Sequence, residues 1–289
     1  MTNDVILKFH KPSGETFTIE SSGDWRFLKN GIVGFGLANG NLSYVDYIMG
    51  DGGEIKNVRL AKADRTVKAA YIKPQNNAIA RRNFLKFFTP RVYYKIYMTY
   101  MNQTRWAEGV LYKLQMSETL DDSLLLTATM TFAFADPLWK SVDDFGRDIA
   151  SVTPNHGWPW LCPIDQTVPV GTFNFERKVT LANDGDVAVY PRVIMIANDY
   201  VENPIFQIND AKVKINDILE AGDEITMDLG ALPPRIEKNG DNFFGHADKK
   251  SEFTKMMLEV GSNTISFDAD NGSDNLSVTV FYNKMYTVI

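Results

Sequence analysis

The sequence of 289 residues predicts a mostly β protein, in which a β domain with one α-helix is followed by a β-sandwich. Segments of alternating apolar and polar residues recur along the chain, which is the two-residue period of a strand with one wet face. Turn dipeptides separate these segments, and their tolerance of positive φ favours tight antiparallel turns. These dipeptides are Asn30-Gly31, Asn39-Gly40, Asp51-Gly52, Asp184-Gly185, Asn239-Gly240 and Asn271-Gly272.

The clearest strand patterns span residues 15–20, 224–229 and 276–282. One segment departs from them, because Ile79, Phe84, Leu85 and Phe88 recur near helical spacing within residues 77–88. Asn77 is a candidate N-cap and Pro90 follows the end. We therefore expect one amphipathic helix packed on the first sheet. A weaker helical pattern spans residues 142–150.

Prolines indicate where the two domains meet. Pro137, Pro154, Pro159, Pro163 and Pro169 fall in a stretch without a sustained period, and proline removes backbone donors and breaks ladders. The expected organisation is a first domain at residues 1–145, a proline-rich connector at 146–172 and a second, all-β domain at 173–289.

Composition is that of a soluble globular protein, with 44% hydrophobic and 23% charged residues. No stretch approaches the roughly 20 apolar residues that span a bilayer, so no membrane insertion is expected. The polar, acidic start favours synthesis in a cytoplasm without a secretory signal.

Charge is unevenly distributed along the chain. The net charge of −6 argues against stable nucleic-acid binding. Residues 1–172 hold 19 basic and 17 acidic residues, a balance of +2, whereas the remaining 11 and 19 give residues 173–289 a balance of −8. The two parts of the chain are expected to present different surfaces.

No motif indicates catalysis, a cofactor or a metal. A single cysteine, Cys162, excludes an internal disulfide, and the three histidines lie far apart in sequence. The glycine-rich residues 34–40 lack the spacing of a phosphate loop. Residues 268–274 carry alternating carboxylates, as calcium loops do, but Asn271-Gly272 favours a hairpin turn there. We expect neither an enzyme nor a bound cofactor or metal.

The most unusual local feature is an interval from residue 65 to residue 107 with nine basic residues and no acidic one. Aromatic residues are interleaved with these cations. Such a mixture fits a protein interface, a helix face whose cations are solvated while the aromatics form core, or, less well, a single-strand nucleic-acid site. The interface hypothesis assigns a ring contact to Arg81, Arg82, Lys86, Arg91, Lys95 and Arg105, with acidic counterparts among Asp46, Asp51, Glu54, Asp121 and Asp122.

The order of features resembles the bacteriophage distal tail protein family, which is a siphophage-type tail component and baseplate hub. The first domain closes with a long strand at residues 124–134 that runs into Asp136-Pro137-Leu138-Trp139. The helix with Arg81, Arg82 and Leu85 precedes it, joined through residues 93–100 and 109–115. The second domain contributes Asn183-Asp184-Gly185-Asp186, Pro191-Arg192-Val193, Asn203-Pro204, Leu219, Gly222-Asp223, Ile225, Leu258, Gly261, Asn263, Ile265 and Phe267.

This resemblance implies an N-terminal belt domain and a galectin-like β-sandwich. It also implies a homohexameric ring in the virion tail, assembled in the bacterial host cytoplasm. The ring would join the tail tube protein to the tip or hub protein and to receptor-binding or baseplate proteins, and the tape measure protein would pass through it. The second domain lacks tryptophan and has His246 as its sole histidine, so the sandwich is expected to be a scaffold and not a galactoside site.

Two alternatives remain at the sequence level. A carbohydrate-binding adhesin of the host surface would use exposed aromatics such as Trp158 and Trp160. A glycosidase-like enzyme would need a pair of carboxylates, which 36 acidic residues could supply without any identifying context.

Overall fold

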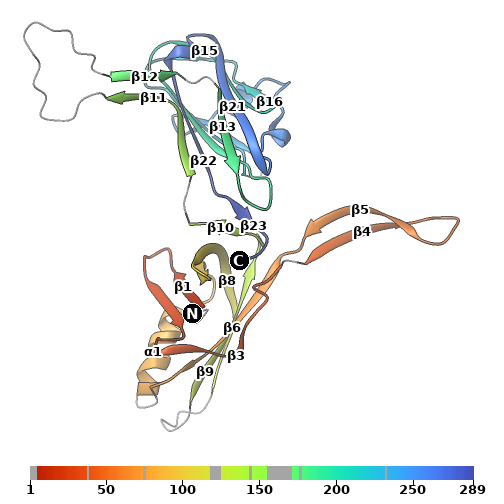
Figure 1. Ribbon diagram of the computed structural model, residues 1–289, viewed down its shortest axis with the longest axis vertical. Helices are drawn as coiled ribbons and strands as arrows, with labels where there is room; N and C mark the ends of the chain where they lie inside the picture. Colours follow the sequence, from red (N-terminus) through yellow and green to blue (C-terminus); the bar gives the residue numbers. More distant parts are fainter. Residues whose placement is uncertain are drawn as a thin grey trace, which may run out of the picture. The chain divides into compact units, whose positions relative to one another are not determined.

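The computed structural model describes residues 5–37, 39–73, 76–117, 125–142, 145–154, 171–175, 178–231 and 233–289; side chains are described outside 145–154 and 171–175. The chain divides into two compact units (Figure 1). Unit 1 comprises Met1–Val142 and Met285–Ile289, and unit 2 comprises Asp143–Lys284. The last five residues thus join the first unit, because β23 (Met285–Tyr286) pairs with β10 (Trp139–Ser141).

Unit 1 is a sheet in the order β2-β1-β7-β8-β9-β6-β3, with β10 attached to β8 and one α-helix. Its elements are β1 (Ile6–His10), β2 (Thr16–Glu20), β3 (Trp25–Val33), β4 (Gly40–Asp46), β5 (Gly53–Leu60), β6 (Ala63–Tyr71), α1 (Asn77–Phe87), β7 (Tyr93–Tyr100), β8 (Gln103–Met116) and β9 (Leu126–Phe134).

Helix α1 covers one face of this sheet through aromatic packing. Phe84 and Phe88 are buried, and their rings lie 5.4 Å and 5.1 Å from the ring of Phe17. Ile79 and Leu85 point to solvent, contrary to the sequence prediction. The buried positions Asn77, Ala80, Phe84 and Phe87 follow helical spacing more closely, so the aromatic stripe decides which face is covered.

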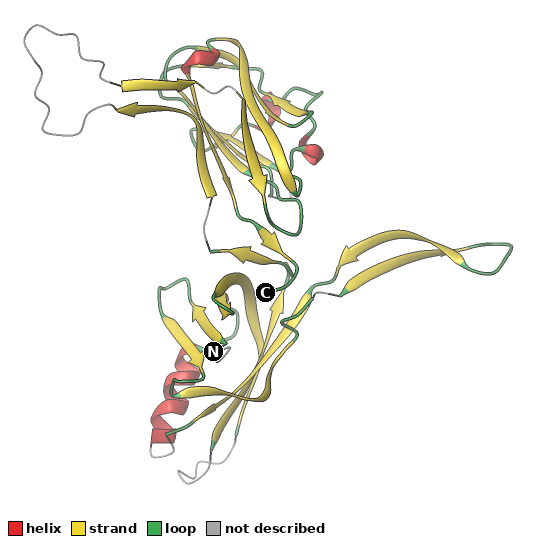
Figure 2. Ribbon diagram, viewed as in Figure 1, coloured by secondary structure: helices red, strands yellow, loops and turns green. Residues whose placement is uncertain are grey.

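Unit 2 is a β-sandwich of two sheets, ordered β12-β11-β22-β14-β18-β19-β20 and β13-β21-β15-β16, with β17 beside β15 (Figure 2). Its strands are β11 (Phe145–Pro154), β12 (Gly171–Phe175), β13 (Lys178–Asn183), β14 (Arg192–Ala197), β15 (Val201–Ile208), β16 (Ala211–Lys214), β17 (Ile218–Leu219), β18 (Glu224–Asp228), β19 (Arg235–Lys238), β20 (Asp241–Asn242), β21 (Gly261–Asn271) and β22 (Leu276–Tyr282). Short 3-10 turns lie at Phe244–His246, Phe253–Lys255 and Ser273–Asn275.

Part of the predicted connector forms regular structure. Strands β11 and β12 pair with each other, and β11 also pairs with β22. The weak helical pattern at residues 142–150 is therefore wrong for most of its length, because pairing with a distant strand outweighs a marginal local period. Residues 155–170, which include Trp158 and Trp160, lie outside the described residues.

Some of the predicted turn signals mark chain reversals, but Asn30-Gly31 does not. Asp51-Gly52 lies at the tip between β4 and β5, and Asn239-Gly240 lies between β19 and β20. Asn30-Gly31 instead lies inside β3, where the register with β6 shifts. Asn271-Gly272 carries the chain from β21 to β22 in the opposite sheet, so it is a turn but not the predicted hairpin. A Cβ on Gly272 would lie 2.1 Å from the carbonyl oxygen of Tyr200.

Strands β4 and β5 form a two-stranded ribbon that projects from the sheet of unit 1 (Figure 1). We call residues 39–61 the arm. Within the described residues its strands pair only with each other, and every residue in both strands is exposed. The arm is thus the part of unit 1 without a packing partner in its own chain.

Candidate assembly surface

Two of the six cations assigned to a ring contact lie exposed on helix α1. Arg82 and Lys86 are solvent-exposed, and Arg91 is exposed in the turn that follows, with φ of 67°. In the part of the chain that the structure describes, none of the three has a side-chain ion pair. We call these three exposed residues, which lie on the helix and in the turn after it, the cation surface.

The other three cations are held by contacts inside unit 1. Arg81 donates to the carbonyl oxygen of Ser117 at 2.6 Å. Lys95 lies over the Trp106 ring, 4.9 Å from its centroid. Arg105 lies 3.6 Å from the centroid of the Tyr286 ring and donates to the carbonyl oxygen of Val288. These side chains fix the sheet and the returning C-terminus, so they are less available to a partner.

Arg65 is the most buried cation of the acid-free interval. Its guanidinium lies 4.0 Å from the Trp139 ring centroid and 4.2 Å from that of Phe134, and it donates to the carbonyl oxygen of Pro137 at 2.6 Å. Burial lowers its pKa to about 10, and the nearby Asp136 carboxylate opposes that shift. Arg65 therefore belongs to the core and not to a surface.

Most aromatics of the same interval are also core. Phe84, Phe87, Phe88 and Tyr94 are buried, whereas Tyr93 is exposed. The four buried rings are unavailable for stacking on nucleotides, which counts against the single-strand binding hypothesis. The same four rings are equally unavailable as anchors of an interface, so Tyr93 is the exposed aromatic that this interval offers to a partner.

The acidic counterparts that the structure describes lie together on the arm. Asp46 ends β4, Glu54 lies in β5, and Asp51 lies at the tip between them; all three are exposed. Asp121 and Asp122 lie outside the described residues. Residues 44–54 contain these three acids and no basic residue, so the tip half of the arm is acidic.

Unit 1 also has a groove of about 310 Å³ near the root of the arm. Apolar side chains from Phe134, Val110 and Leu138 line it together with the exposed ring of Tyr93. Lys62 and Lys140 line it as well, as do the carboxylates of Glu108 and Asp136. Tyr93, which lines this groove, follows Arg91 of the cation surface by two residues in the sequence.

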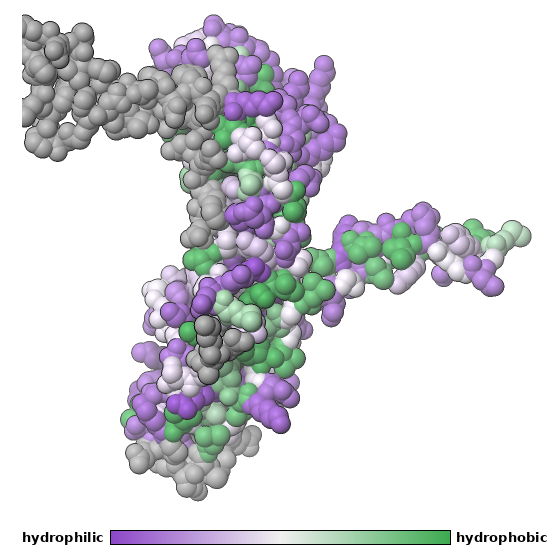
Figure 3. Space-filling model, in the orientation of Figure 1, coloured by the Kyte–Doolittle hydropathy of each residue, from purple (hydrophilic) through white to green (hydrophobic). Residues whose placement is uncertain are grey.

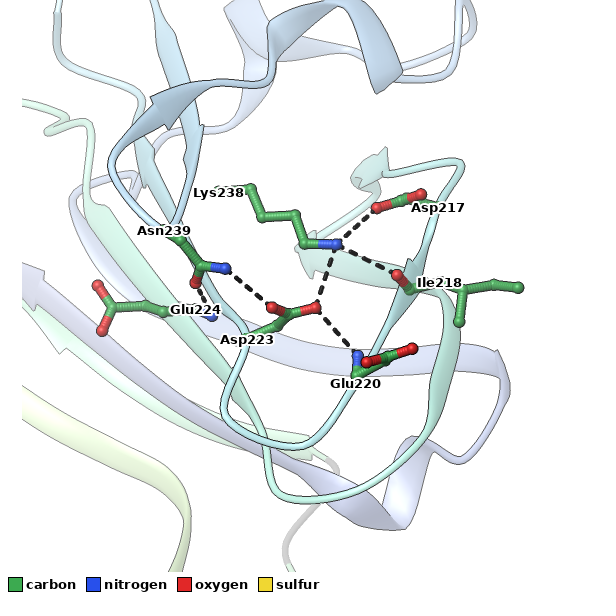
Figure 4. Close-up of polar contacts among 7 residues, drawn as sticks. All are labelled: Asp217, Ile218, Glu220, Asp223, Glu224, Lys238 and Asn239. Atoms are coloured by element: carbon green, nitrogen blue, oxygen red, sulfur yellow. Dashed lines mark hydrogen bonds and ion pairs between the residues drawn. The ribbon is translucent and has the colours of Figure 1, made fainter.

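A polar cluster in unit 2 surrounds Lys238 (Figure 4). Its ammonium group donates to Asp217 at 2.9 Å and to the carbonyl oxygen of Ile218, and it lies 3.1 Å from Asp223. Asp223 also accepts from the backbone N–H of Glu220 and from the side chain of Asn239. The cluster ties β19 to the start of β17 and to the loop between β17 and β18.

These contacts shift the pKa values of both partners toward their charged forms. Hydrogen bonds from Asn239 and from the Glu220 backbone, with Lys238 adding to them, lower the pKa of Asp223. Burial opposes the charge of Lys238, but its bonds to Asp217 and Asp223 prevail and raise its pKa. Both groups therefore stay charged and keep fixed partners, which is typical of a structural ion pair and not of a residue that transfers protons.

The remaining sequence candidates also have structural partners. In the segment 268–274, whose alternating carboxylates resemble those of a calcium loop, Asp270 pairs with Lys214 at 2.6 Å and accepts from Asn203, and these bonds lower its pKa. His246 stacks on Phe243 with ring centroids 3.8 Å apart. The described residues contain no cluster of three metal-ligating side chains and no helix long and apolar enough to cross a membrane.

The family comparison defines the class of protein. Residues 184–286 match the siphovirus-type tail component, C-terminal domain. Unit 2 is therefore a tail-component domain, which confirms the resemblance drawn from the sequence and places the chain among structural proteins of the virion tail. Comparison with curated protein sequences gives no match.

Solved structures then identify the fold of the whole chain. It is similar to the Dit protein of phage SPP1, described as a paradigm of the hub adsorption apparatus in phages that infect Gram-positive bacteria. That likeness has a TM-score of 0.63 at 13% identity over 96% of this chain and 98% of that one. A chain of the phage P2 baseplate in its activated conformation matches with a TM-score of 0.54 at 10% identity over 99% of both chains. The predicted mostly β fold with one helix and a sandwich is confirmed, and the tail component has the fold of a distal tail protein.

Proposed function

We propose that this protein is a non-enzymatic hub at the tail tip, in which six copies of unit 1 close into a ring and unit 2, a galectin-like sandwich, serves as an attachment scaffold. The observation that carries the proposal is the likeness to the SPP1 hub protein over nearly the full length of both chains. The tail-component match of residues 184–286 supports it independently.

The ring would connect the tail tube protein on one side to the tip or hub protein on the other. Receptor-binding or baseplate proteins would attach around it, and the tape measure protein would pass through its channel. The net charge of −6 suits a channel that must release nucleic acid instead of retaining it. The clasped, paired carboxylates of unit 2 support a scaffold role over catalysis.

Unit 1 is proposed to supply the ring contact. A cyclic ring uses a heterologous interface, in which one patch meets a different patch of the next copy. The cation surface of Arg82, Lys86 and Arg91 would form one side, flanked by Arg81, Lys95 and Arg105. Their charges would set register and association rate more than affinity.

The test combines native mass spectrometry with electron microscopy of the full chain. We expect a hexameric ring for the wild type and a folded monomer for the double variant Arg82→Glu, Lys86→Glu at moderate salt. These two positions are preferred over Arg81, since Arg81 holds the backbone of Ser117.

A matched control is Lys249→Glu, Lys250→Glu, which makes the same charge change at exposed positions of unit 2. The control should remain a ring. A wild type that stays monomeric at every concentration would refute the ring, and a double variant that assembles normally would show that the helix cations are merely solvated.

A further inference from the structure

The register of the arm sorts its side chains onto two chemically different faces. In the ladder between β4 and β5, Leu42 lies opposite Val58, and Tyr44 lies opposite Ile55. Because directly opposed residues share a face, most of the apolar residues gather on one side. The other side carries Asn41, Ser43, Asn57 and Arg59, with Val45 opposite Glu54 toward the tip. The apolar face consists of Leu42, Tyr44, Ile55, Val58 and Leu60.

A bulge at Lys56 maintains this separation. Ser43 pairs with Asn57 and the next residue, Tyr44, pairs with Ile55, so Lys56 is the extra residue. Without the bulge, the two-residue period would place Lys56 and not Ile55 on the face of Val58. Instead, Lys56 is free of the ladder and pairs with Glu54 at 2.5 Å. The irregularity keeps a charge off the apolar face.

Nothing in the described chain covers this face. Tyr44 is 63% exposed and Val58 65% exposed, and at the tip Ile48 and Met49 are 100% and 96% exposed. Figure 3 shows hydrophobic residues along the arm next to hydrophilic ones. A lone two-stranded ribbon is only marginally stable in water, and a contiguous exposed apolar patch marks an interaction site. The apolar face of the arm therefore has the character of an interaction surface.

We propose that the apolar face of the arm docks onto unit 1 of a second copy of this chain, with the acidic tip half meeting the cation surface. The inference rests on the proposed ring and names the two surfaces that close it. The arm would deliver the apolar contact that the cation surface lacks, since the aromatics beneath the cation surface are buried in their own core.

Charge complementarity selects a second copy as the partner. Residues 44–54 carry three acids and no base, whereas residues 65–107 carry nine bases and no acid. Among the described residues, no ion pair joins an acid of residues 44–54 to a base of residues 65–107, and the strands of the arm pair only with each other. Contact between different patches of two identical copies is heterologous and can repeat around a ring. The groove lined by Tyr93, Phe134 and Leu138 lies on unit 1, and it would accept apolar side chains from the arm of the other copy.

The first test changes one face of the arm at a time. The variant Leu42→Thr, Ile55→Thr, Val58→Thr keeps β-branched residues in the strands but makes the apolar face polar. The matched control Asn41→Thr, Ser43→Thr, Asn57→Thr places the same residue on the opposite face of the same strands. Native mass spectrometry of the full chain should show rings for the wild type and the control. The apolar-face variant should be monomeric, with hydrogen-exchange protection of β6 and β9 unchanged.

The second test swaps charges. Asp46→Lys, Asp51→Lys, Glu54→Lys should block assembly, as should Arg82→Glu, Lys86→Glu, Arg91→Glu. Combining both sets in one chain should restore at least a tenfold greater ring fraction than either set alone. Because the combined variant carries six reversals, recovery would be hard to explain by anything other than contact between the two surfaces.

The outcomes separate the inference from the ring itself. Rings formed equally well by the apolar-face variant would overturn the arm contact and leave the ring intact. If the combined charge-swap variant does not regain ring assembly, the proposed contact between the arm and the cation surface is overturned. A wild type that never assembles would refute the proposed function and the inference with it.

Discussion

The arm and the hairpin of β15 and β16 in unit 2 are both antiparallel ribbons with one apolar face, yet one is bare and the other covered. In unit 2, Phe206 lies opposite Val213 and both are buried, at 0% and 1% exposed. In the arm, Tyr44 lies opposite Ile55 and both are more than half exposed. The alternation of apolar and polar residues thus defines an apolar face in both ribbons, but it does not determine what covers that face. In unit 2 a second sheet covers it, and in our proposal another copy of the chain covers the face of the arm.

The largest expected effect comes from truncating the covered face. Phe206→Ala should destabilise unit 2 by about 3–5 kcal/mol, since it removes a fully buried ring and leaves a cavity. The counterpart Ile55→Ala in the arm should change the stability of the monomer by less than about 0.5 kcal/mol. Urea unfolding followed by peptide-resolved hydrogen exchange measures each unit separately. Equal losses at both positions would show that the arm is covered within its own chain.

A second contrast concerns the turns. Gly272→Ala should cost about 3 kcal/mol, because φ is 72° and the new Cβ would lie 2.1 Å from the Tyr200 carbonyl oxygen. Gly52 at the arm tip also has positive φ, at 93°, but its nearest neighbour would be a Tyr47 ring carbon 4.0 Å away. Gly52→Ala should therefore cost only the strain of the positive φ, about 1–2 kcal/mol, without an added steric clash. Thermal unfolding of the two variants gives the comparison, and a costly Gly52→Ala would reveal a fixed packing role for the tip.

Much of this fold follows from local sequence. The strand patterns at residues 15–20, 224–229 and 276–282 became β2, β18 and β22. The predicted helix is present as Asn77–Phe87, but its N-cap is Asn76 and not Asn77, and no side-chain hydrogen bond caps it. The segment at 142–150 could not be assigned, because its pairing with β22 joins residues more than a hundred positions apart. The local hydrophobic periodicity of a segment does not indicate which distant strand it pairs with.

The candidate site shows the same limit. The acid-free interval was visible as a charge pattern, but sequence could not tell that Arg65 is buried against Trp139 while Arg82 is exposed. Nor could it place Asp46 and Glu54 on a ribbon without a partner, since exposure depends on the tertiary arrangement. The turn signal Asp51-Gly52 marked the tip, and the bulge at Lys56 had no signal at all.

The smallest expected effect compares two lysine–carboxylate contacts. Lys238→Met should destabilise unit 2 by about 1–2 kcal/mol, because it leaves the partly buried Asp217 and Asp223 without their shared donor. Lys56→Met in the arm should cost less than about 0.5 kcal/mol, since both partners of its pair with Glu54 are more than half exposed.

The contribution of Asp223 should also depend on pH with a defined sign. Its pKa is lowered in the folded state by Asn239, the Glu220 backbone and Lys238, so its stabilisation is present above the normal carboxylate pKa of about 4 and is lost as pH falls through the folded value. Asp223→Asn should therefore be less stable than the wild type at pH 7, and the gap should narrow below about pH 4. Lys238 has a raised pKa in the folded state, so its contribution to the free energy of unfolding is fully present at neutral pH. That contribution is lost only when the pH rises through the raised pKa, under strongly alkaline conditions. Urea midpoints of both proteins between pH 3 and pH 7 measure the gap, and a pH-independent gap would mean that the Asp223 carboxylate acts by shape and not by charge.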